Sequence, residues 1–533
     1  MARTSLGGVS VAIVGGGFSG IAAGVYLRKA GCEDFVIFES SAGPGGTWWD
    51  TRYPGAEVDT PSHLYSYSFT HHDWSRPYAG HDELRRYLHD VVAEHDLERH
   101  FSLQAEVKRA TWVEDRHQYL VEASDGTRRH FDALVSAVGM LNEPRIPELD
   151  GMAEFRGSIV HTSRWDASVD VTGKRVAVIG TGSTAAQVVP VIAQAAEKLS
   201  VFQRQASWVD PKENKPYTPR QRRRLAWAPA HRLERLRNYY AGERLWFGGR
   251  LIRPGTEADE QARRVGVDYL RTVFRAHPEL LRTMTPDIPY QGRRPVHATG
   301  FLEALTKDNV ALVPRAVVGM TPEGVVDSSG EEHPADLVIL ATGFQTSNYL
   351  ARLGVVGRYG RSIHDVWAGE PQAFCGVTVP GFPNFFMLYG PNTNFYALVH
   401  GFEQQARFMV RSLQHMVRKG GTAVDCHPTF FAAYNEWLQR RLAKSSWAVG
   451  DNYFKSKTTG RIVTQWPDGA LVYTLLTRLL AVPSARVTRR SAPGVRSEMV
   501  SGPPAVLPGE DPSSVVAPVM AGSSCSDVEA ESV

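Results

Sequence analysis

Glycines recur in two short runs that could cradle phosphate groups. The first reads Val11-Ala-Ile-Val-Gly15-Gly-Gly17-Phe18-Ser-Gly20, and the second reads Val176-Ala-Val-Ile-Gly180-Thr181-Gly182-Ser183-Thr184-Ala185. In such runs the first Gly makes a tight turn, the second admits a pyrophosphate, and a small third residue keeps helix and strand close. The free N–H groups of the helix then face the anion. Together the two runs predict a protein that holds two dinucleotides and passes electrons between them.

The residue that ends the second strand differs between the two units. Glu39 ends strand 35–39, where an acid can accept a hydrogen bond from a ribose hydroxyl. Arg204 ends strand 199–204, where an Arg can pair with a 2′-phosphate. We therefore expect FAD at the first site and NADPH at the second.

The elements that must position these residues alternate between strand and helix. Strand 10–14, helix 19–30 and strand 35–39 form the first unit, and residues 174–204 form the second. Buried strands 133–139 and 335–343 resemble each other and bracket the second unit. The predicted fold is α/β, with two Rossmann-like domains, the NADP-binding one inserted in a discontinuous FAD-binding one, and a helical insertion.

The predicted boundaries divide the chain into five parts. They are a first FAD-binding part (1–150), an NADP-binding domain (151–208 and 286–335), a helical insertion (209–285), a second FAD-binding part with the substrate pocket (336–483) and a disordered tail (484–533). The tail is rich in Pro, Ser, Gly and Val. Because it has few large apolar side chains to bury, it cannot offset the entropy of ordering.

Composition excludes several classes of protein. The chain has 533 residues, a net charge of +3 and four scattered cysteines, which argues against a disulfide framework, a metal site and a redox Cys pair. Four arginines at 220–224 are interpreted as a solvated helix face, so no nucleic-acid partner is expected. Without a membrane-length apolar run or room for a signal peptide, we expect no membrane partner, a cytoplasmic location, and a monomer or small homo-oligomer.

A segment between the two glycine runs carries a family signature. Phe155-Arg-Gly157-Ser-Ile-Val-His161-Thr-Ser-Arg-Trp165-Asp166 is similar to the F-x-G-x-x-x-H-x-x-x-W-P/D signature of type I Baeyer–Villiger monooxygenases, within the flavin monooxygenase superfamily. Segments 45–59, 62–69, 381–386 and 390–393 also resemble the family, and the match spans roughly residues 10–470. It implies FAD, NADPH and a flavin C4a-peroxide that inserts one oxygen atom of O2 beside a ketone carbonyl. The substrate would be a cyclic or polycyclic ketone and the product an ester or lactone.

The resemblance also implies which residues are catalytic. Arg294, in Gly292-Arg-Arg294-Pro, matches the family's Arg, and Asp59 matches the acid that orients it. This chemistry needs fixed positive charge where negative charge develops, and an Arg stays charged when desolvated. His161 and Trp165 are expected to act as hinge or cofactor-positioning residues, since in the family this segment links the domains.

The glycine runs and the resemblance together predict two sets of cofactor-binding residues. The FAD set is Gly15, Gly17, Phe18, Gly20, Glu39, Thr47, Trp48, Trp49, Asp50, Asp59, Tyr65 and Val107. The NADPH set is Gly180, Thr181, Gly182, Ser183, Thr184, Ala185, Gln187, Gln203 and Arg204.

The sequence departs from the family late in the chain and leaves alternatives open. The family commonly has Ser-Trp-Tyr late in the chain, where this sequence has Asp451-Asn-Tyr453-Phe454. Whether Tyr453 replaces the Trp stays open. The alternative functions are a flavin monooxygenase that oxidises N or S atoms, which would not require Arg294 and Asp59, and a non-catalytic redox sensor. A disulfide reductase is excluded by the missing cysteine pair.

Overall fold

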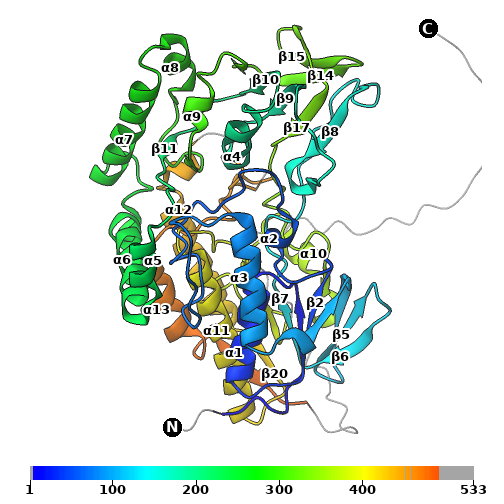
Figure 1. Ribbon diagram of the computed structural model, residues 1–533. Coiled ribbons are helices and arrows are strands. Elements are labelled where there is room, and N and C mark those ends of the chain that lie inside the picture. Colours follow the sequence, from blue (N-terminus) through cyan, green and yellow to red (C-terminus); the bar gives the residue numbers. More distant parts are fainter. Residues whose placement is uncertain (1–3, 450–451, 457, 491–533) are drawn as a thin grey trace, which may run out of the picture. The chain divides into compact units, whose positions relative to one another are not determined.

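Two parallel five-stranded sheets organise the chain. The computed structural model describes residues 4–449, 452–456 and 458–490. The first sheet has the order β19-β7-β1-β2-β3. Figure 1 labels its strands β2 and β7. Its strands are β1 (Val11–Val14), β2 (Phe35–Glu39), β3 (Phe101–Leu103), β7 (Ala133–Ser136) and β19 (Phe385–Met387).

The second sheet has the order β13-β10-β9-β17-β8, and all of its neighbouring strands are parallel. Its strands are β8 (Ser158–His161), β9 (Arg175–Ile179), β10 (Lys198–Phe202), β13 (Val310–Val313) and β17 (Leu337–Leu340). These strands lie between β7 and β19 in the chain. The first sheet is therefore built from both sides of the second, and the predicted fold class is confirmed. The residues at which the parts divide stay predictions.

Smaller sheets and helices complete the described residues. The remaining strands are β4 (Val107–Val113), β5 (Gln118–Ala123), β6 (Arg128–Phe131), β11 (Val209–Pro211), β12 (Val296–Ala298), β14 (Val317–Thr321), β15 (Gly324–Asp327), β16 (Glu332–Pro334), β18 (Gly354–Val356), β20 (Ala423–Cys426) and β21 (Ala485–Thr488). The helices are α1 (Phe18–Lys29), α2 (Thr47–Asp50), α3 (His81–Glu94), α4 (Ser183–Ile192), α5 (Pro219–Ala226), α6 (Ala228–Trp246), α7 (Glu257–Val273), α8 (Pro278–Met284), α9 (Phe301–Ala304), α10 (Ile363–Trp367), α11 (Leu398–Arg418), α12 (Pro428–Leu442) and α13 (Ala470–Leu480).

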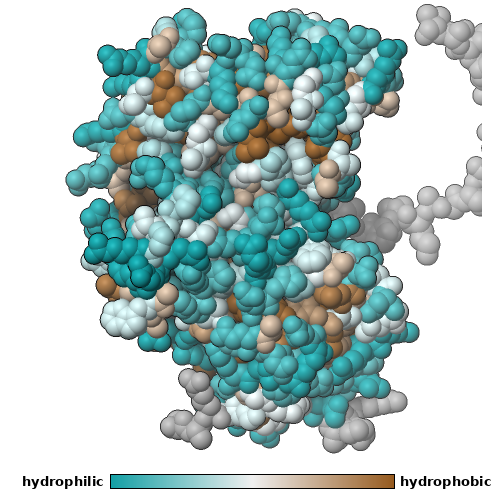
Figure 2. Space-filling model, in the orientation of Figure 1, coloured by the Kyte–Doolittle hydropathy of each residue, from teal (hydrophilic) through white to brown (hydrophobic). Residues whose placement is uncertain are grey.

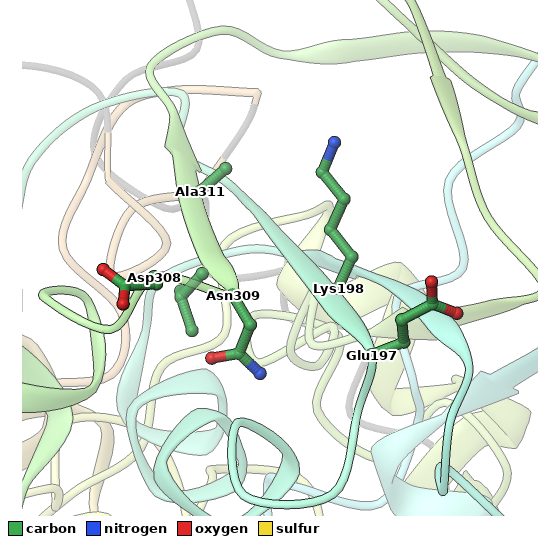
Figure 3. Close-up of a pocket in the computed structure, with 6 residues that line it drawn as sticks. Glu197, Lys198, Asp308, Asn309 and Ala311 are labelled. Atoms are coloured by element: carbon green, nitrogen blue, oxygen red, sulfur yellow. The ribbon is translucent and has the colours of Figure 1, made fainter.

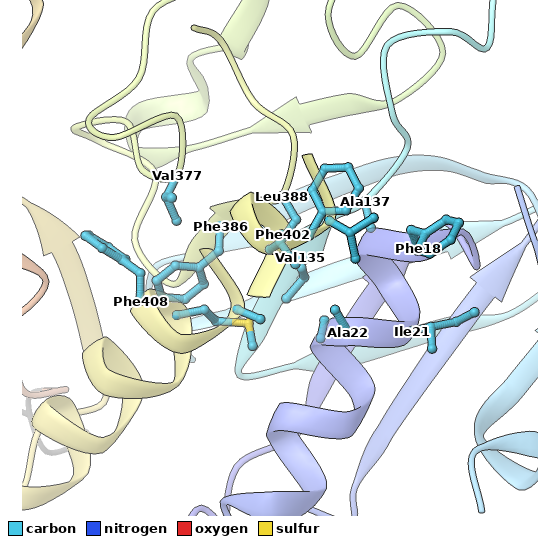
Figure 4. Packing of buried hydrophobic residues seen from close by; sticks show 14 of the residues in the cluster. Phe18, Ile21, Ala22, Val135, Ala137, Val377, Phe386, Leu388, Phe402 and Phe408 are labelled. Carbon is cyan, nitrogen blue, oxygen red and sulfur yellow. The ribbon is translucent and has the colours of Figure 1, made fainter. Parts of the chain in front are cut away.

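The main core lies where α1 and α11 pack beside β7 and β19. Phe18 and Ile21 of α1, Val135 of β7, Phe386 of β19 and Phe402 of α11 belong to one buried cluster (Figure 4). Burying each such side chain stabilises the fold by about 1.5–3 kcal/mol. This core fixes the first glycine turn, which joins β1 to α1.

The end of the chain corrects one prediction. The expected disordered tail at 484–533 is wrong for residues 485–488, because they form β21, which pairs antiparallel with β20. Val487 packs on the main core, and a Cβ on Gly421 would lie 2.1 Å from its side chain. The pairing partner lies some 60 residues earlier in the chain, so composition gave no sign of it. The predicted tail from 491 lies outside the described residues.

The surface is mostly hydrophilic on the face drawn in Figure 2, where apolar side chains form small separate groups. Among the described residues, no helix is both long enough and apolar enough to cross a membrane.

Candidate active site

The first glycine turn has the geometry of a phosphate cradle. Gly15 has a φ of +109°, and a Cβ on Gly20 would lie 1.9 Å from the carbonyl oxygen of Gly15, so only Gly fits there. No side chain caps α1, whose first N–H groups therefore stay available to an anion. These features fit the pyrophosphate of FAD.

Glu39 lies beside this turn as expected. Its side chain is buried, and its carboxylate accepts hydrogen bonds from the N–H groups of Gly16 (2.7 Å) and Ser41 (2.8 Å). The Ala105 N–H donates to the Glu39 carbonyl (2.9 Å), and Val107 follows at the start of β4. The strand end, the turn and Val107 are thus brought together, while the ribose contact itself stays a prediction.

The second glycine turn leaves room in front of α4. Gly180 has a φ of +118°, and a Cβ on Gly182 would meet no atom within 4 Å. No side chain caps α4, while Ala185 is fully buried against the sheet. Thr181, Ser183 and Thr184 line the same open turn and are half-buried. An uncapped helix behind open space fits the pyrophosphate of NADPH.

The residues after β10 differ in exposure. The strand ends at Phe202, two residues earlier than predicted, because its pairing with β9 ends there. Gln203 is buried, and its Nε2 donates to the Thr283 carbonyl (3.1 Å). Arg204 is exposed and forms no ion pair with any residue that the structure describes. The guanidinium group is therefore free to meet a 2′-phosphate.

The two tryptophans of α2 point to different neighbours. Trp48 Nε1 donates to the Tyr65 hydroxyl (3.2 Å), and Phe18 packs edge-on against Tyr65 (5.1 Å between centroids). Trp49 instead packs over Gly43, where a Cβ would lie 2.3 Å from its ring. Of the two indole rings, only that of Trp48 lies with Tyr65 and Phe18.

The loop that carries these tryptophans meets the first glycine turn. A Cβ on Gly46 would lie 3.0 Å from the Cα of Gly17, so the two backbones touch. Thr47 begins α2 and is exposed, and Asp50 at its end accepts from the Ser41 hydroxyl (3.3 Å). The loop that carries Thr47 to Asp50 thus touches the first glycine turn.

Arg294 and Asp59 form an ion pair across 235 residues of sequence. Arg294 Nη2 lies 2.6 Å and Nε 3.1 Å from the same Asp59 oxygen, and 41% of the Arg294 side chain is exposed. Burial raises the pKa of Asp59, but the charges of Arg294 and His297 outweigh it and hold that pKa below its ordinary value. Asp59 raises the pKa of Arg294 above its ordinary range. The pair stays ionised and can be reached by a ligand.

A second ion pair, which the sequence analysis missed, fixes the loop before Asp59. The side chain of Lys212 is 1% exposed, and its Nζ lies 2.7 Å from Glu57 Oε1 and 2.7 Å from the Val58 carbonyl. Burial lowers the pKa of Lys212, and Glu57 opposes that shift. Since 155 residues separate the partners, no local pattern could have indicated this pair.

Gln187 joins α4 to the flavin-side loop. Its Oε1 accepts from the Tyr53 hydroxyl (2.8 Å), and its Nε2 donates to the Glu57 carbonyl (2.8 Å). A Cβ on Gly55 would lie 2.4 Å from the Gln187 carbonyl oxygen. This predicted NADPH contact therefore ties the second glycine unit to the loop that carries Asp59.

His161 lies where the chain passes between the two sheets. It ends β8, is buried, and packs edge-on against Phe344 (6.0 Å between centroids). The Arg145 N–H donates to the Gly343 carbonyl (2.8 Å), so the two linking segments pair with each other. Burial lowers the pKa of His161, which keeps the imidazole neutral near pH 7. Trp165 packs into the core of the second sheet.

One hollow lies away from this site. It has a volume of about 380 Å³ and is lined by Glu197, Lys198, Asp308, Asn309, Val310 and Ala311 (Figure 3). Lys198 and Val310 begin β10 and β13, so the hollow is at the amino ends of these strands. Dinucleotides bind at the carboxyl ends of parallel strands, which makes this hollow no part of the candidate site.

Comparisons with known proteins agree with the geometry. Residues 12–241 match a family described as pyridine nucleotide-disulphide oxidoreductase, although Cys32, Cys375 and Cys426 are free. The chain is 33% identical over 482 residues to a Baeyer–Villiger monooxygenase of Pseudomonas aeruginosa, which covers 88% of this chain and 89% of that one.

Solved structures resemble the chain over nearly its whole described length. An oxidised steroid monooxygenase bound to NADP aligns with a TM-score of 0.82 and 30% identity, covering 90% of this chain and 99% of that one. Cyclohexanone monooxygenase from Rhodococcus sp. Phi1 bound to NADP+ aligns with a TM-score of 0.81 and 29% identity, covering 92% and 100%. The resemblance predicted from the sequence is confirmed.

Proposed function

The chain belongs to the Baeyer–Villiger monooxygenases, and from this premise we propose that Arg294, oriented by Asp59, is the fixed positive charge at the point of oxygen insertion. The enzyme depends on FAD and NADPH and converts a ketone to an ester or lactone. One oxygen atom of O2 enters the product and the other leaves as water, with NADPH and a proton consumed. The observation that carries the proposal is the ion pair between Arg294 and Asp59.

The charge of Arg294 is suited to this reaction. The chemistry that FAD and NADPH supply when bound is the two-electron activation of O2. Negative charge then develops on oxygen, and a preorganised cation stabilises it without reorganisation. Asp59 accepts two hydrogen bonds from one edge of the guanidinium group, which fixes its plane. We propose that the other edge faces the reacting atoms.

The cofactor residues follow from the two glycine turns. We assign FAD to the turn at Gly15 and NADPH to the turn at Gly180, with Arg204 on the 2′-phosphate. His161 is assigned a hinge role, since it is buried and packs against Phe344 in the segment that links the two sheets.

The substrate is proposed to be a lipophilic cyclic or polycyclic ketone. The solved relatives are named for cyclohexanone and for steroids. Tyr389 and Tyr453 both raise the pKa of Arg294, so aromatic side chains lie near the guanidinium group. We propose that Tyr453 occupies the place of the family's Trp, with a smaller apolar face.

Isotope labelling tests the reaction class. The holoenzyme is supplied with NADPH, 18O2 and, separately, cyclohexanone, a steroid ketone, a thioether and a tertiary amine. We expect a lactone with one 18O atom in the ring, seen by mass spectrometry. Oxidation of the thioether or amine with no lactone from any ketone would contradict the proposal and favour the N- or S-oxidising alternative.

A further inference from the structure

The outward side of α6 carries three exposed apolar side chains. Leu233, Leu236 and Tyr240 are 67%, 61% and 71% exposed. Their spacing of three and four residues places them on one side of the helix. Trp227, just before α6, and Phe247, just after it, are 66% and 46% exposed. A helix that packs on a core normally turns polar side chains outward, so the core does not explain this side of α6.

The helix α13 extends the apolar surface. Leu471, Leu475 and Leu479, each four residues apart, are 45%, 49% and 66% exposed. The N–H of Leu471 donates to Oε1 of Glu243 in α6 (2.8 Å), and Figure 1 draws the two helices together. We define the apolar face by these residues: Trp227, Leu233, Leu236, Tyr240, Phe247, Leu471, Leu475 and Leu479.

Arginines accompany the apolar face. Residues 219–247 hold eight arginines and two glutamates, whereas the whole chain has a net charge of only +3. Glu243 is buried, so it does not offset this charge at the surface. Arg237 and Arg244 each follow an apolar-face residue by four positions, one helical turn further along the same side. Exposed arginines without an ion pair to any described residue are Arg220, Arg223, Arg224, Arg232 and Arg244.

The positive charge of the arginines beside the apolar face indicates which kind of partner binds there. A second copy on a twofold axis would bring arginines against arginines, which costs free energy. An anionic phospholipid surface pairs with arginine, while Leu, Trp, Tyr and Phe enter the boundary between headgroups and acyl chains. We propose that α6 and the neighbouring α13 dock flat on an anionic membrane surface. No segment needs to cross the bilayer for this.

Vesicle sedimentation tests the docking, and it measures binding and not turnover, so it is independent of the proposed substrate. The full chain with FAD is mixed with vesicles of phosphatidylcholine alone or with about one third phosphatidylglycerol. We expect binding to the anionic vesicles at low salt, at least ten-fold weaker binding to the neutral ones, and weakening at high salt because screening reduces the charge attraction.

A variant that removes apolar side chains from the apolar face tests whether vesicle binding depends on this face or on exposed apolar residues anywhere on the surface. Leu233→Gln, Leu236→Gln and Tyr240→Gln combined should lower the partition coefficient at least ten-fold, since three exposed apolar side chains are removed. The matched control combines Leu103→Gln and Val318→Gln, which are 41% and 49% exposed elsewhere, and it should bind like the parent. Equal binding by the face variant and the control would overturn the proposal.

A variant that removes arginines tests whether positive charge contributes to membrane binding. Arg237→Gln with Arg244→Gln should weaken binding to anionic vesicles about five-fold for each arginine at the surface. Arg128→Gln with Arg264→Gln, both exposed elsewhere, is the control and should have no effect. Absence of binding to anionic vesicles at low salt would overturn the proposal. So would a dimer in light scattering that the apolar variant makes monomeric, which would assign the face to a second copy.

Discussion

We propose that the single residue Arg204 sets the preference for NADPH. Arg204→Ala should raise the KM for NADPH about 10- to 150-fold and leave that for NADH nearly unchanged, because a charge-assisted bond to phosphate contributes about 1.5–3 kcal/mol. Steady-state kinetics with both nucleotides measures this. Equal use of NADH and NADPH by the parent enzyme would show that Arg204 meets no phosphate.

Residues in local patterns were predictable, and residues paired over long distances were not. Gly15 and Gly180 were predicted from their runs, because a tight turn imposes its residue locally. Arg294 and Asp59 were found only through the family resemblance, since 235 residues separate them. Lys212 and Glu57 were missed altogether, because only the folded chain brings a Lys to that loop.

Two buried histidines, His63 and His231 of α6, make the stability of the fold sensitive to acid. The rings of His63 and His231 lie 5.0 Å apart. Burial, with His71 and Arg235, lowers the pKa of His63 to about 4. Burial, with His63 and His71, lowers the pKa of His231 to about 3. Both residues are neutral in the folded chain, while the unfolded chain binds protons below about pH 6.5.

Stability should therefore fall as the pH drops from about 6.5 toward 4. The loss is about 1.4 kcal/mol per pH unit for each of the two histidines, until the folded pKa is reached. Thermal unfolding at pH 7.5 and 5.0 measures it. His231→Phe should reduce the difference between the two pH values, and the half-buried His277→Gln should not. An identical acid sensitivity of His231→Phe and the parent would contradict this prediction.

Truncation can measure how much β21 contributes to the stability of the fold. A chain that ends at Pro483 loses β21, including the bond from the Thr422 N–H to the Thr488 carbonyl (2.9 Å). Each lost hydrogen bond costs about 1 kcal/mol, so its melting temperature should fall by several degrees. A chain that ends at Arg490 keeps β21 and, on the composition of the predicted tail, should match the parent. Equal melting of both truncations would show that β21 contributes nothing.

Elements were predicted best where burial is continuous. Strand 35–39 was predicted at the bounds of β2, because its apolar run matches its burial. β21 was missed because it has four half-exposed or exposed residues and depends on a distant partner. The exposed apolar side of α6 also could not be predicted, since a sequence does not show which side of a helix packs.

The two sheets contribute different halves of the candidate site. Asp59 lies in the loop after α2, whose Val58 packs in the core of the first sheet, whereas Arg294 lies between α8 and β12, whose Val296 packs in the core of the second sheet. Gln187 of α4 and Lys212, which follows β11, each bind this loop at Glu57, through its carbonyl and its carboxylate respectively. The whole molecule is therefore needed to assemble the pair. This also explains why the sequence alone could predict two dinucleotide sites but not their meeting point.

The most direct test of the role of Arg294 compares flavin reduction with ester formation in Arg294→Ala, with the exposed Arg282→Ala in α8 as control. Both rates are measured on the same holoenzyme with NADPH and a ketone that the parent converts. We predict that FAD stays bound and is reduced by NADPH within about ten-fold of the parent rate. Ester formation should fall at least about 10²–10³-fold, because the fixed charge is lost. Ester formation by Arg294→Ala near the parental rate would show that Arg294 is not the fixed positive charge that oxygen insertion requires.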